Sequence, residues 1–492
     1  MKKYIGITIG PIFDTINLTS SPVALWASSY LFSQLSKALC EQLLAAGLRE
    51  EAIVTPYYSR GDELLLRKDG VGLYPDRIIF CSEGFEKSRF PGICDRAVNT
   101  VLNQFGLSAS ADYLKKYLRI SAAEYEAENP IEGSTHILNS LELSGSFVDR
   151  ETDGNPILTL FNGNDETKNA KLRETPVISS LENFQLRKSD GFKSIEDIVT
   201  FERTGFKKYN YYAIVRADGD NMSGIISSLS GDGAVRSFSK ACLGYCSDIA
   251  EKVREFGGVT VYSGGDDLLA ILPCESEGGR TPFDFVGEAR GVFNKHFAEY
   301  SKPVSLSFGI FIAYRKFPLY EALDSSWKLL FYTAKDPQRK NGTAVTLQKH
   351  SGQSEKLFIG NELMGSFTDI LKKFTARSKQ AAADKKTDTE SGGSDVLTTV
   401  MHKLAEFGPI LDEAGDTDTV GNLFKNLFDG VAQKDSDFLQ KDVCRFYDTV
   451  RTSGGRFISF DSNGGLRKHR AETVCDALRV AKFYSEKSGG KS

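Results

Sequence analysis

The hydrophobic and polar positions of the first eighty or so residues predict a strand, a long helix and a hairpin. A short β-type run at residues 4–9 is broken by Gly10–Pro11. A helical pattern then covers about residues 23–46, with Pro22 near its start, where proline is favoured. Further strands are predicted at residues 53–55 and 77–81.

The region from about 207 to 350 has the most regular pattern of the chain. Apolar strand-like runs alternate there with amphipathic helical stretches, and a Gly-rich turn joins the second and third runs. This β-α-β-β-α-β order predicts a ferredoxin-like, or palm, domain. The first segment has the matching strand, helix and hairpin order and is predicted to be a degenerate second copy. The predicted strands of the 207–350 region are 211–217, 259–262, 268–272, 304–313 and 343–347, and its helices are 235–256, 283–300 and 319–334.

The sequence therefore predicts an α+β protein in several parts. Between the two palms lies a mixed insert, near the end of which Ser194 is the expected N-cap of a short helix. A stretch rich in Lys, Ala, Asp, Ser and Gly is typical of a flexible linker, and helical periodicity dominates after it. The predicted parts are a first palm (1–85, without a Gly-Gly-Asp-Asp turn), an insert or linking domain (86–205), a second palm (206–375), a linker (376–395) and a C-terminal helical domain (396–492).

Composition narrows the class of protein. The 492 residues are 40% hydrophobic and 26% charged, with a net charge of −4, whereas a free-standing, non-specific nucleic-acid binder is usually basic. Contact with RNA is therefore expected to be local or shared with partner subunits. No secretory signal precedes the first strand, and no apolar run reaches the roughly 18 residues of a membrane span, so a cytoplasmic location and no membrane partner are expected. The eight cysteines are scattered, which disfavours disulfides and a structural zinc site.

Acidic residues follow two strands of the predicted second palm. Asp218 ends the strand at 211–217, and Asp266 and Asp267 occupy the tip of the hairpin. The strand end and the hairpin tip become neighbours in a β-α-β-β unit, so the carboxylates converge on one edge of the sheet. Carboxylates this close repel one another unless a divalent cation neutralises them, and magnesium favours such a site. We therefore predict that Asp218, Asp266 and Asp267 are catalytic and bind Mg²⁺ (or Mn²⁺), with Gly219 among the metal-binding residues.

The turn itself predicts a nucleotide-binding site. Gly264 and Gly265 let the backbone turn tightly and approach a triphosphate, and two metals can activate a 3′-hydroxyl and stabilise the leaving pyrophosphate. Ser263, Asp220 and Asn221 are assigned to the same nucleotide-binding set. Two polar turns rich in Gly and Asp would be the alternative, and each motif alone favours it, but the two together at this spacing favour the site. Asp220 is the weakest of the four carboxylates, since it can simply cap the following helix.

Cationic residues follow the last predicted helix of the second palm. Lys335 and Lys340 can reach triphosphate oxygens as point charges. The alternative is that these residues only complement the negative end of the helix dipole. For Lys335 the nucleotide contact is favoured, and for Arg339 the two interpretations are equal.

Taken together, these motifs resemble the large polymerase-like subunit of type III CRISPR effector complexes, in its Cmr-type branch. The resemblance covers most of residues 1–350 and is weaker in the C-terminal helices. It implies two facing palms, with Gly10, Ser28 and Ser29 of the first near the nucleotide. It also implies magnesium-dependent synthesis of cyclic oligoadenylates from ATP when guide RNA (crRNA) pairs with target RNA, within a complex of other subunits. The stretches that carry it are 7–12 with 25–31, 217–224, 262–267, and then 305–313, 318–320 and 334–341.

The chain departs from that family in two respects. Many members begin with an HD nuclease domain, but this sequence starts at the first palm, and none of its five histidines is followed by Asp. HD-type DNase activity is therefore not expected. The family's zinc site in the insert is in doubt because only Cys81 and Cys94 lie nearby.

Three other functions remain open from the sequence. The same palm chemistry can join AMP to another small molecule, such as S-adenosylmethionine. A diguanylate cyclase of the GGDEF type is disfavoured by Asp267-Leu268 in place of Glu-Phe. A different class of function is a non-catalytic scaffold that anchors the crRNA and the helical subunits, against which the retained carboxylates argue.

Overall fold

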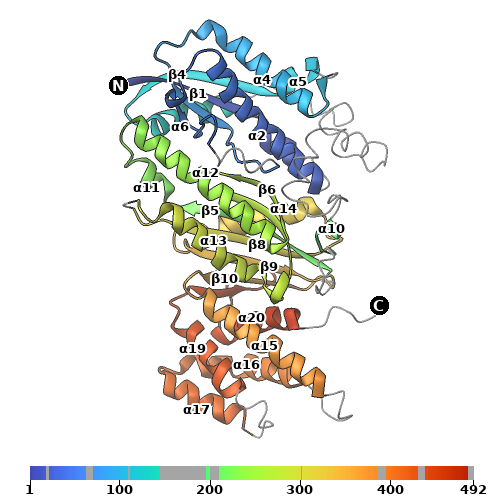
Figure 1. Ribbon diagram of the computed structural model, residues 1–492. Coiled ribbons are helices and arrows are strands. Elements are labelled where there is room, and N and C mark those ends of the chain that lie inside the picture. The colour runs from blue at the N-terminus through green and yellow to red at the C-terminus, as the bar shows by residue number, and fades with distance from the viewer. Residues whose placement is uncertain are drawn as a thin grey trace.

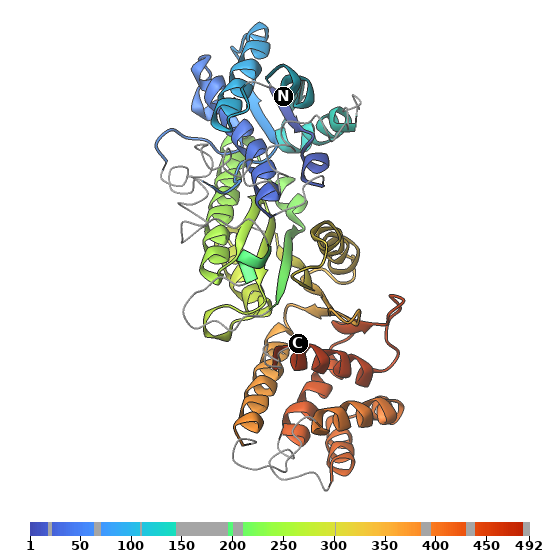
Figure 2. The same ribbon diagram turned by 90° about the vertical axis from the view of Figure 1, so that its right-hand side faces the viewer.

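The computed structural model builds the chain around two β-sheets. It describes residues 1–17, 22–62, 70–108, 111–143, 195–199, 210–300, 302–384, 395–429 and 438–485. One sheet has four strands and the other has seven. In Figure 1 and Figure 2 the two sheets and a group of C-terminal helices follow one another along the long axis. Within the described part of the chain, no helix is both long and apolar enough to cross a membrane.

The four-stranded sheet belongs to a complete β-α-β-β-α-β unit. Its order is β2-β3-β1-β4, and all of its strand pairs are antiparallel. This is the ferredoxin-like topology, so the first unit has the predicted strand, helix and hairpin and, in addition, a second helix and a fourth strand. Its elements are β1 (Lys2–Gly10), α1 (Ile12–Asn17), α2 (Pro22–Ala45), η1 (Glu50–Ala52), β2 (Ile53–Thr55), β3 (Arg77–Cys81), η2 (Lys87–Arg89), α4 (Phe90–Gln104), α5 (Ala111–Tyr117), β4 (Arg119–Ala127) and α6 (Pro130–Leu143).

The first sheet reaches further along the chain than the predicted boundary at residue 85. β4 pairs with β1 along the whole of that strand, although it lies in the predicted insert. Only Tyr125 and Ala127 of β4 are buried, because this edge strand has one face covered and the other facing solvent. Its weak hydrophobic pattern explains why the sequence did not indicate it. In the rest of the insert, α10 (Ile195–Val199) matches the predicted short helix, whereas Ser194 lies outside the described residues.

The second unit repeats the same topology and confirms the predicted element order. Four of its strands lie in the order β8-β5-β7-β6, which is equivalent to β4-β1-β3-β2 of the first unit. Gly257, with a φ of 96°, ends α12 in the left-handed conformation that glycine adopts without strain. The elements are β5 (Tyr211–Asp220), α11 (Met222–Ile226), α12 (Gly231–Phe256), β6 (Val259–Gly264), β7 (Asp267–Pro273), η4 (Glu277–Gly279), α13 (Pro282–Phe297) and β8 (Ser305–Tyr314).

Three more strands extend this sheet beyond β8. Helix α14 (Leu319–Lys328) and the π-helix η5 (Leu329–Ala334) return the chain to β9 (Gly342–Gln348), which is parallel to β8. β10 (Ser354–Gly360) follows, and β11 (Phe457–Phe460) completes the edge. η5 packs closely on β8, since a Cβ atom on Gly309 would lie 2.6 Å from the Leu330 backbone nitrogen.

The C-terminal region is mainly helical, as expected, but it is joined to the palm sheet through β11. The predicted linker at 376–395 is partly wrong: α15 continues through Asp384, because its Ala, Lys, Arg and Gln residues favour helix. Residues 385–394 lie outside the described part of the chain. The helices are α15 (Met364–Asp384), α16 (Asp395–Glu413), α17 (Thr417–Leu427), η6 (Phe438–Val443), α19 (Cys444–Thr452) and α20 (Arg470–Ser485).

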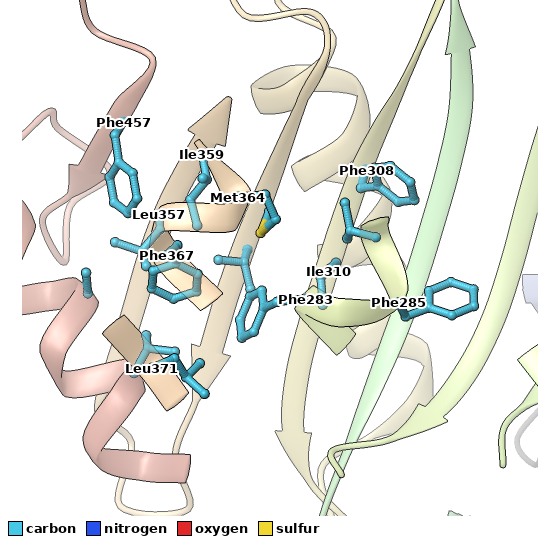
Figure 3. Packing of buried hydrophobic residues seen from close by; sticks show 14 of the residues in the cluster. Phe283, Phe285, Phe308, Ile310, Leu357, Ile359, Met364, Phe367, Leu371 and Phe457 are labelled. Atoms are coloured by element: carbon cyan, nitrogen blue, oxygen red, sulfur yellow. The ribbon is translucent and has the colours of Figure 1, made fainter. Parts of the chain in front are cut away.

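One hydrophobic core runs from the second unit into the C-terminal helices. Figure 3 shows Phe283 of α13 and Phe367 of α15 packed together over the strands of the second sheet, and their ring centroids are 4.9 Å apart. Phe367 also contacts the ring of Phe457 on β11, at 5.9 Å. These rings are fully or almost fully buried, so the C-terminal helices and the second palm share a core rather than forming separate ones.

Helix α12 of the second unit holds the first unit in place. Asp232 near its start accepts hydrogen bonds from Lys2 Nζ (2.8 Å) and Tyr4 Oη (2.5 Å). One turn further on, the Arg236 guanidinium donates to three backbone carbonyls of the first unit, at 2.5–2.9 Å. The carbonyls belong to Glu50, Ile53 and Tyr58.

Candidate active site

The hairpin between β6 and β7 brings its two aspartates to the end of β5, as predicted. Gly264 pairs with Asp267, and Gly265 at the tip has a φ of 69°, a conformation that side-chain-bearing residues rarely adopt. A Cβ atom on Gly219 would lie 2.6 Å from an Asp266 carboxylate oxygen. Glycine at position 219 therefore lets the hairpin approach the strand end this closely.

The two hairpin carboxylates lie in surroundings that disfavour their charge. Burial, followed by repulsion from Asp267, raises the pKa of Asp266 to about 7, although the backbone N–H groups of Asp266 and Gly219 oppose the rise. Burial also raises the pKa of Asp267 to about 6, against the attraction of the Arg216 guanidinium. A cation placed beside these carboxylates would restore their ionised forms.

Asp218 forms an ion pair with Lys335, the lysine that was predicted from the sequence to contact the triphosphate. The Lys335 ammonium forms an ion pair with the Asp218 carboxylate and donates a hydrogen bond of 2.7 Å to the Gly219 carbonyl. Their side chains are only 19% and 15% exposed, so the pair is largely shielded from water. The ammonium thus lies on two oxygens that the sequence analysis assigned to a metal.

The Asp220 side chain has a structural role at the end of β5. Its Oδ2 atom accepts hydrogen bonds from Ser305 Oγ and Ser307 Oγ, both at 2.7 Å, and from the Asn341 backbone N–H at 3.0 Å. The residue is 1% exposed. These hydrogen bonds join β5 to β8 and to the loop before β9. The sequence predicted a nucleotide contact for Asp220, with a helix cap as the alternative.

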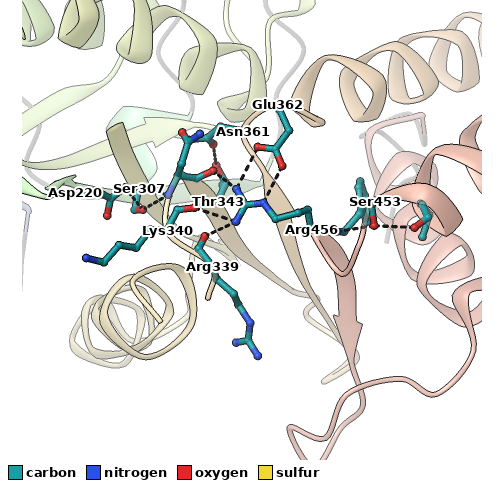
Figure 4. A network of polar contacts seen from close by, with 12 residues as sticks. Asp220, Ser307, Arg339, Lys340, Thr343, Asn361, Glu362, Ser453 and Arg456 are labelled. Carbon is teal, nitrogen blue, oxygen red and sulfur yellow. Dashed lines mark hydrogen bonds and ion pairs between the residues drawn. The ribbon is translucent and has the colours of Figure 1, made fainter. Parts of the chain in front are cut away.

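The cationic loop before β9 divides its charged residues between two sides. Lys340 Nζ donates to Asn221 Oδ1 at 3.0 Å, which places it beside the end of β5. The Arg339 guanidinium instead lies over the ring of Phe460, 5.6 Å from its centroid. Figure 4 shows the Arg339 side chain directed away from Lys340 and Asp220. This contact with the Phe460 ring matches neither of the two interpretations of Arg339.

A cavity of about 760 Å³ lies between the two units, next to the hairpin. Gly10 and Ser29 line it from the first unit, and Gly264 and Asp267 line it from the second. Ser28 is fully buried inside α2, where its hydroxyl donates to the Leu25 carbonyl. The sequence thus identified residues on both walls of the cavity, while Ser28 has a structural contact.

Several charged residues line the cavity that the sequence motifs did not indicate. Arg216 shares a face of β5 with Asp218, two residues away, and this alternation was the available signal. Asp76, whose pKa is raised by burial, comes from the loop before β3. Arg119 lies at the start of β4, and its buried Nε atom has no hydrogen-bond partner among the residues that the structure describes. Nothing local in the sequence marks the last two. The cavity also includes Lys115, Lys116 and Glu142.

The site has the donor chemistry of a divalent-cation site but not a closed ligand set. Within the described ranges, no three His, Cys, Asp or Glu side chains are arranged to hold a metal. The oxygens of Asp218, Gly219 and Asp266 are hard ligands that suit Mg²⁺, and an ammonium already occupies the first two. These residues fit a cation once Lys335 has moved. Cys81 and Cys94 of the first unit are free thiols.

Two facing ferredoxin-like units with an aspartate-bearing hairpin define a palm-type protein. The family model for the second palm domain of Cas10/Cmr2 matches residues 211–344, and the model for the N-terminal part of the CRISPR-associated protein Cmr2 matches residues 4–106. Both matches are to the Cas10/Cmr2 family, which confirms the resemblance seen in the sequence.

Individual relatives agree with this assignment. The Cmr subunit Cmr2 of Pyrococcus furiosus is 29% identical over 206 residues, which cover 36% of this chain and 23% of that protein, so the chain matches less than a quarter of this relative's length. A type III-B Cmr-beta structure in the apo state superposes with a TM-score of 0.59 at 11% identity, over 98% of this chain and 82% of the other. A Csm1–Csm4 cassette in complex with cA4 gives a TM-score of 0.54 at 14% identity, over 98% and 70%. At these identities the structures support the fold.

Proposed function

We propose that this chain is the nucleotidyltransferase subunit of a type III CRISPR effector complex. It would make cyclic oligoadenylates from ATP when guide RNA in the complex pairs with target RNA. The observation that carries the proposal is that the hairpin with Asp266 and Asp267 meets the end of the strand that carries Asp218, beside a cavity that the first palm closes. A similarly folded cassette has been solved with cA4, which supports a nucleotide as the ligand.

The acidic residues of the site would bind the metal ion. A bound Mg²⁺ or Mn²⁺ would supply Lewis-acid activation of the attacking hydroxyl and charge stabilisation of the leaving pyrophosphate. Asp218, Asp266 and the Gly219 carbonyl would hold it. Asp267, on the cavity side of the hairpin, would face the nucleotide. The raised pKa values of both hairpin carboxylates mean that neutralisation by a cation is favourable there.

The cationic residues would recognise the triphosphate. Lys335 would leave Asp218 for the phosphate oxygens, and Lys340, 3.0 Å from Asn221, would contact them from the neighbouring loop. Both act as point charges that carry no base specificity. Gly10 and Ser29 would contact a second nucleotide from the opposite wall of the cavity, where the small side chains leave room.

The partners of the chain follow from the same proposal. It would assemble with the other subunits of a type III complex and contact crRNA and target RNA within it. A net charge of −4 is consistent with RNA contacts that are shared with those subunits.

The test uses the assembled complex, Mg²⁺ and labelled ATP, with and without target RNA. Mass spectrometry of the product identifies the base, the linkage and any acceptor other than ATP. We expect cyclic oligoadenylates with target RNA, and their loss in the double variant Asp266→Asn, Asp267→Asn. Asp324→Asn is the matched control, because Asp324 lies on the surface of α14 in an exposed ion pair with Lys328.

Two results would contradict the proposal. A complex that forms no product with target RNA would indicate the scaffold function. A product in which AMP is joined to another small molecule would show the same chemistry with a different acceptor, and cyclic oligoadenylate synthesis would be rejected.

A further inference from the structure

The loop before β9 is attached to the C-terminal region through its backbone. The loop carries Lys340, and its last three carbonyls, those of Arg339, Lys340 and Asn341, all accept hydrogen bonds from one side chain. That side chain is Arg456, which lies after α19 and directly before β11. The Asn341 backbone has a φ of 59°, a left-handed conformation that costs free energy unless its surroundings hold it.

Every N–H direction of the Arg456 guanidinium is used. Nη1 donates to the Arg339 and Lys340 carbonyls, both at 2.9 Å, and Nη2 donates to the Asn341 carbonyl at 2.7 Å. Nε and Nη2 also donate to the Glu362 carboxylate at 2.8 and 3.1 Å. Figure 4 shows the guanidinium between the loop and Glu362. Only arginine has this planar set of five donors.

The other side of the loop is attached to the end of β5. The Asn341 N–H donates to Asp220 Oδ2 at 3.0 Å, and Lys340 Nζ donates to Asn221 Oδ1 at 3.0 Å. Asn361, next to Glu362, donates to Asn341 Oδ1 at 3.1 Å. The loop is therefore held between the C-terminal region and the strand that carries Asp218.

We propose that Arg456 is a positioning residue for nucleotide binding. Its hydrogen bonds to three consecutive carbonyls fix the loop so that Lys340 lies beside the end of β5. The C-terminal region thereby contributes to the geometry of the nucleotide site. The inference rests on the proposed function, because it assigns Lys340 to the triphosphate. It goes beyond that function by coupling the site to a region outside both palms.

The alternative is that Arg456 only stabilises the fold. The two roles predict different kinetics. A variant of a positioning residue weakens the binding of ATP more than a variant of a similarly bonded arginine that lowers the unfolding temperature equally. A purely structural residue lowers the unfolding temperature and reduces the amount of active protein, which lowers the apparent kcat and leaves KM unchanged.

The experiment compares Arg456→Met and Arg456→Lys with Arg451→Met in the assembled complex. Arg451 is the matched control: its guanidinium binds the Asp448 carboxylate and the Gly415 carbonyl within the C-terminal helices. The measurements are the Kd of a non-hydrolysable ATP analogue, KM and kcat for ATP, and the unfolding temperature. Hydrogen exchange of residues 339–341 in the free chain is measured as well.

We expect Arg456→Met to raise Kd and KM about tenfold, which corresponds to ~1.4 kcal/mol, because one charge-assisted phosphate contact is misplaced. The kcat should stay within about threefold and the unfolding temperature should match that of Arg451→Met. Exchange at residues 339–341 should rise only in the Arg456 variants. Arg456→Lys should recover little of the affinity, since one ammonium cannot bridge three carbonyls and Glu362.

The outcomes separate this inference from the proposed function. If the wild-type complex does not bind the analogue, the proposed function and this inference both fail. If the wild-type complex binds it and Arg456→Met binds equally well, only this inference is overturned. A lower kcat and unfolding temperature with an unchanged KM would also overturn it, in favour of the structural role.

Discussion

The Lys335 ammonium lies on the Asp218 carboxylate and on the Gly219 carbonyl, 2.7 Å away from the latter. A metal ion at the strand end would need the same two oxygens. The lysine therefore supplies at the strand end the positive charge that a cation would supply. A triphosphate would attract the ammonium and leave Asp218 and Gly219 open, so that metal and nucleotide would enter the site together.

Replacing Lys335 should therefore separate metal binding from nucleotide binding. In Lys335→Met, we expect the affinity for Mn²⁺ alone to increase about tenfold and the affinity for an ATP analogue to decrease about tenfold, each change corresponding to ~1.4 kcal/mol. Titrations of each ligand separately measure both. Lys328→Met, which removes an exposed lysine of α14, is the control. A decrease of both affinities would indicate damage to the site instead of exchange.

The hairpin carboxylates should make the stability of the metal-free protein depend on pH. The pKa of Asp266 is raised from 3.8 to about 7 in the folded protein, so its contribution to stability is complete below about pH 4 and is lost as the pH rises through about 7. We expect Asp266→Asn to be more stable than the wild type by ~1–3 kcal/mol at pH 8 and to lose this advantage at pH 4.

Unfolding temperatures measured across this pH range without divalent cations test the prediction. Mg²⁺ should reduce the difference at pH 8, because it favours the ionised carboxylate of the wild type. Asp324→Asn should show no such pH dependence. A difference between Asp266→Asn and the wild type that stays constant from pH 4 to pH 8 would contradict it.

Asp220 should be needed for stability more than for nucleotide contact. Asp220→Ala removes the carboxylate oxygen that accepts hydrogen bonds from Ser305, Ser307 and the Asn341 N–H, and we expect the free energy of unfolding to fall by ~2–4 kcal/mol. Asp220→Asn keeps one acceptor oxygen, so its free energy of unfolding should fall less. Urea unfolding measures both variants. Normal stability together with lost ATP binding would instead support the direct nucleotide role expected from the sequence.

Arg236 should hold the first palm against the second. Arg236→Met removes three hydrogen bonds to carbonyls of the first unit and a contact over the ring of Tyr57, 4.8 Å from its centroid. We expect ~2–3 kcal/mol less stability, faster hydrogen exchange at residues 50–58, and weaker ATP binding, because Gly10 and Ser29 lose their place in the cavity wall.

A matched control for this variant is Arg280→Met. Arg280 donates to a carboxylate and a carbonyl and lies over a ring, but all of these partners belong to the second unit. Arg280→Met should lower the free energy of unfolding without changing hydrogen exchange at residues 50–58. Equal exchange in the two variants would show that Arg236 does not join the palms.

The sequence by itself determined the features that depend on neighbouring residues. The periodicity of residues 211–347 defined the strands and helices of the second palm, because burial of one face imposes a regular spacing on apolar residues. The glycines at 264 and 265 indicated the turn, since Gly265 has a positive φ. The strand end and hairpin then had to meet, because the β-α-β-β connection allows few arrangements.

Only the tertiary structure decided which distant groups meet. β4 and β11 carry weak or short patterns, and their places depend on pairing with strands far away in the sequence. Asp220 turned inward to two serines of β8, and Lys335 lies on Asp218 instead of facing solvent. Arg456 reaches a loop more than a hundred residues earlier in the chain. Such contacts follow from the packing of whole elements, and no local pattern of residues encodes them.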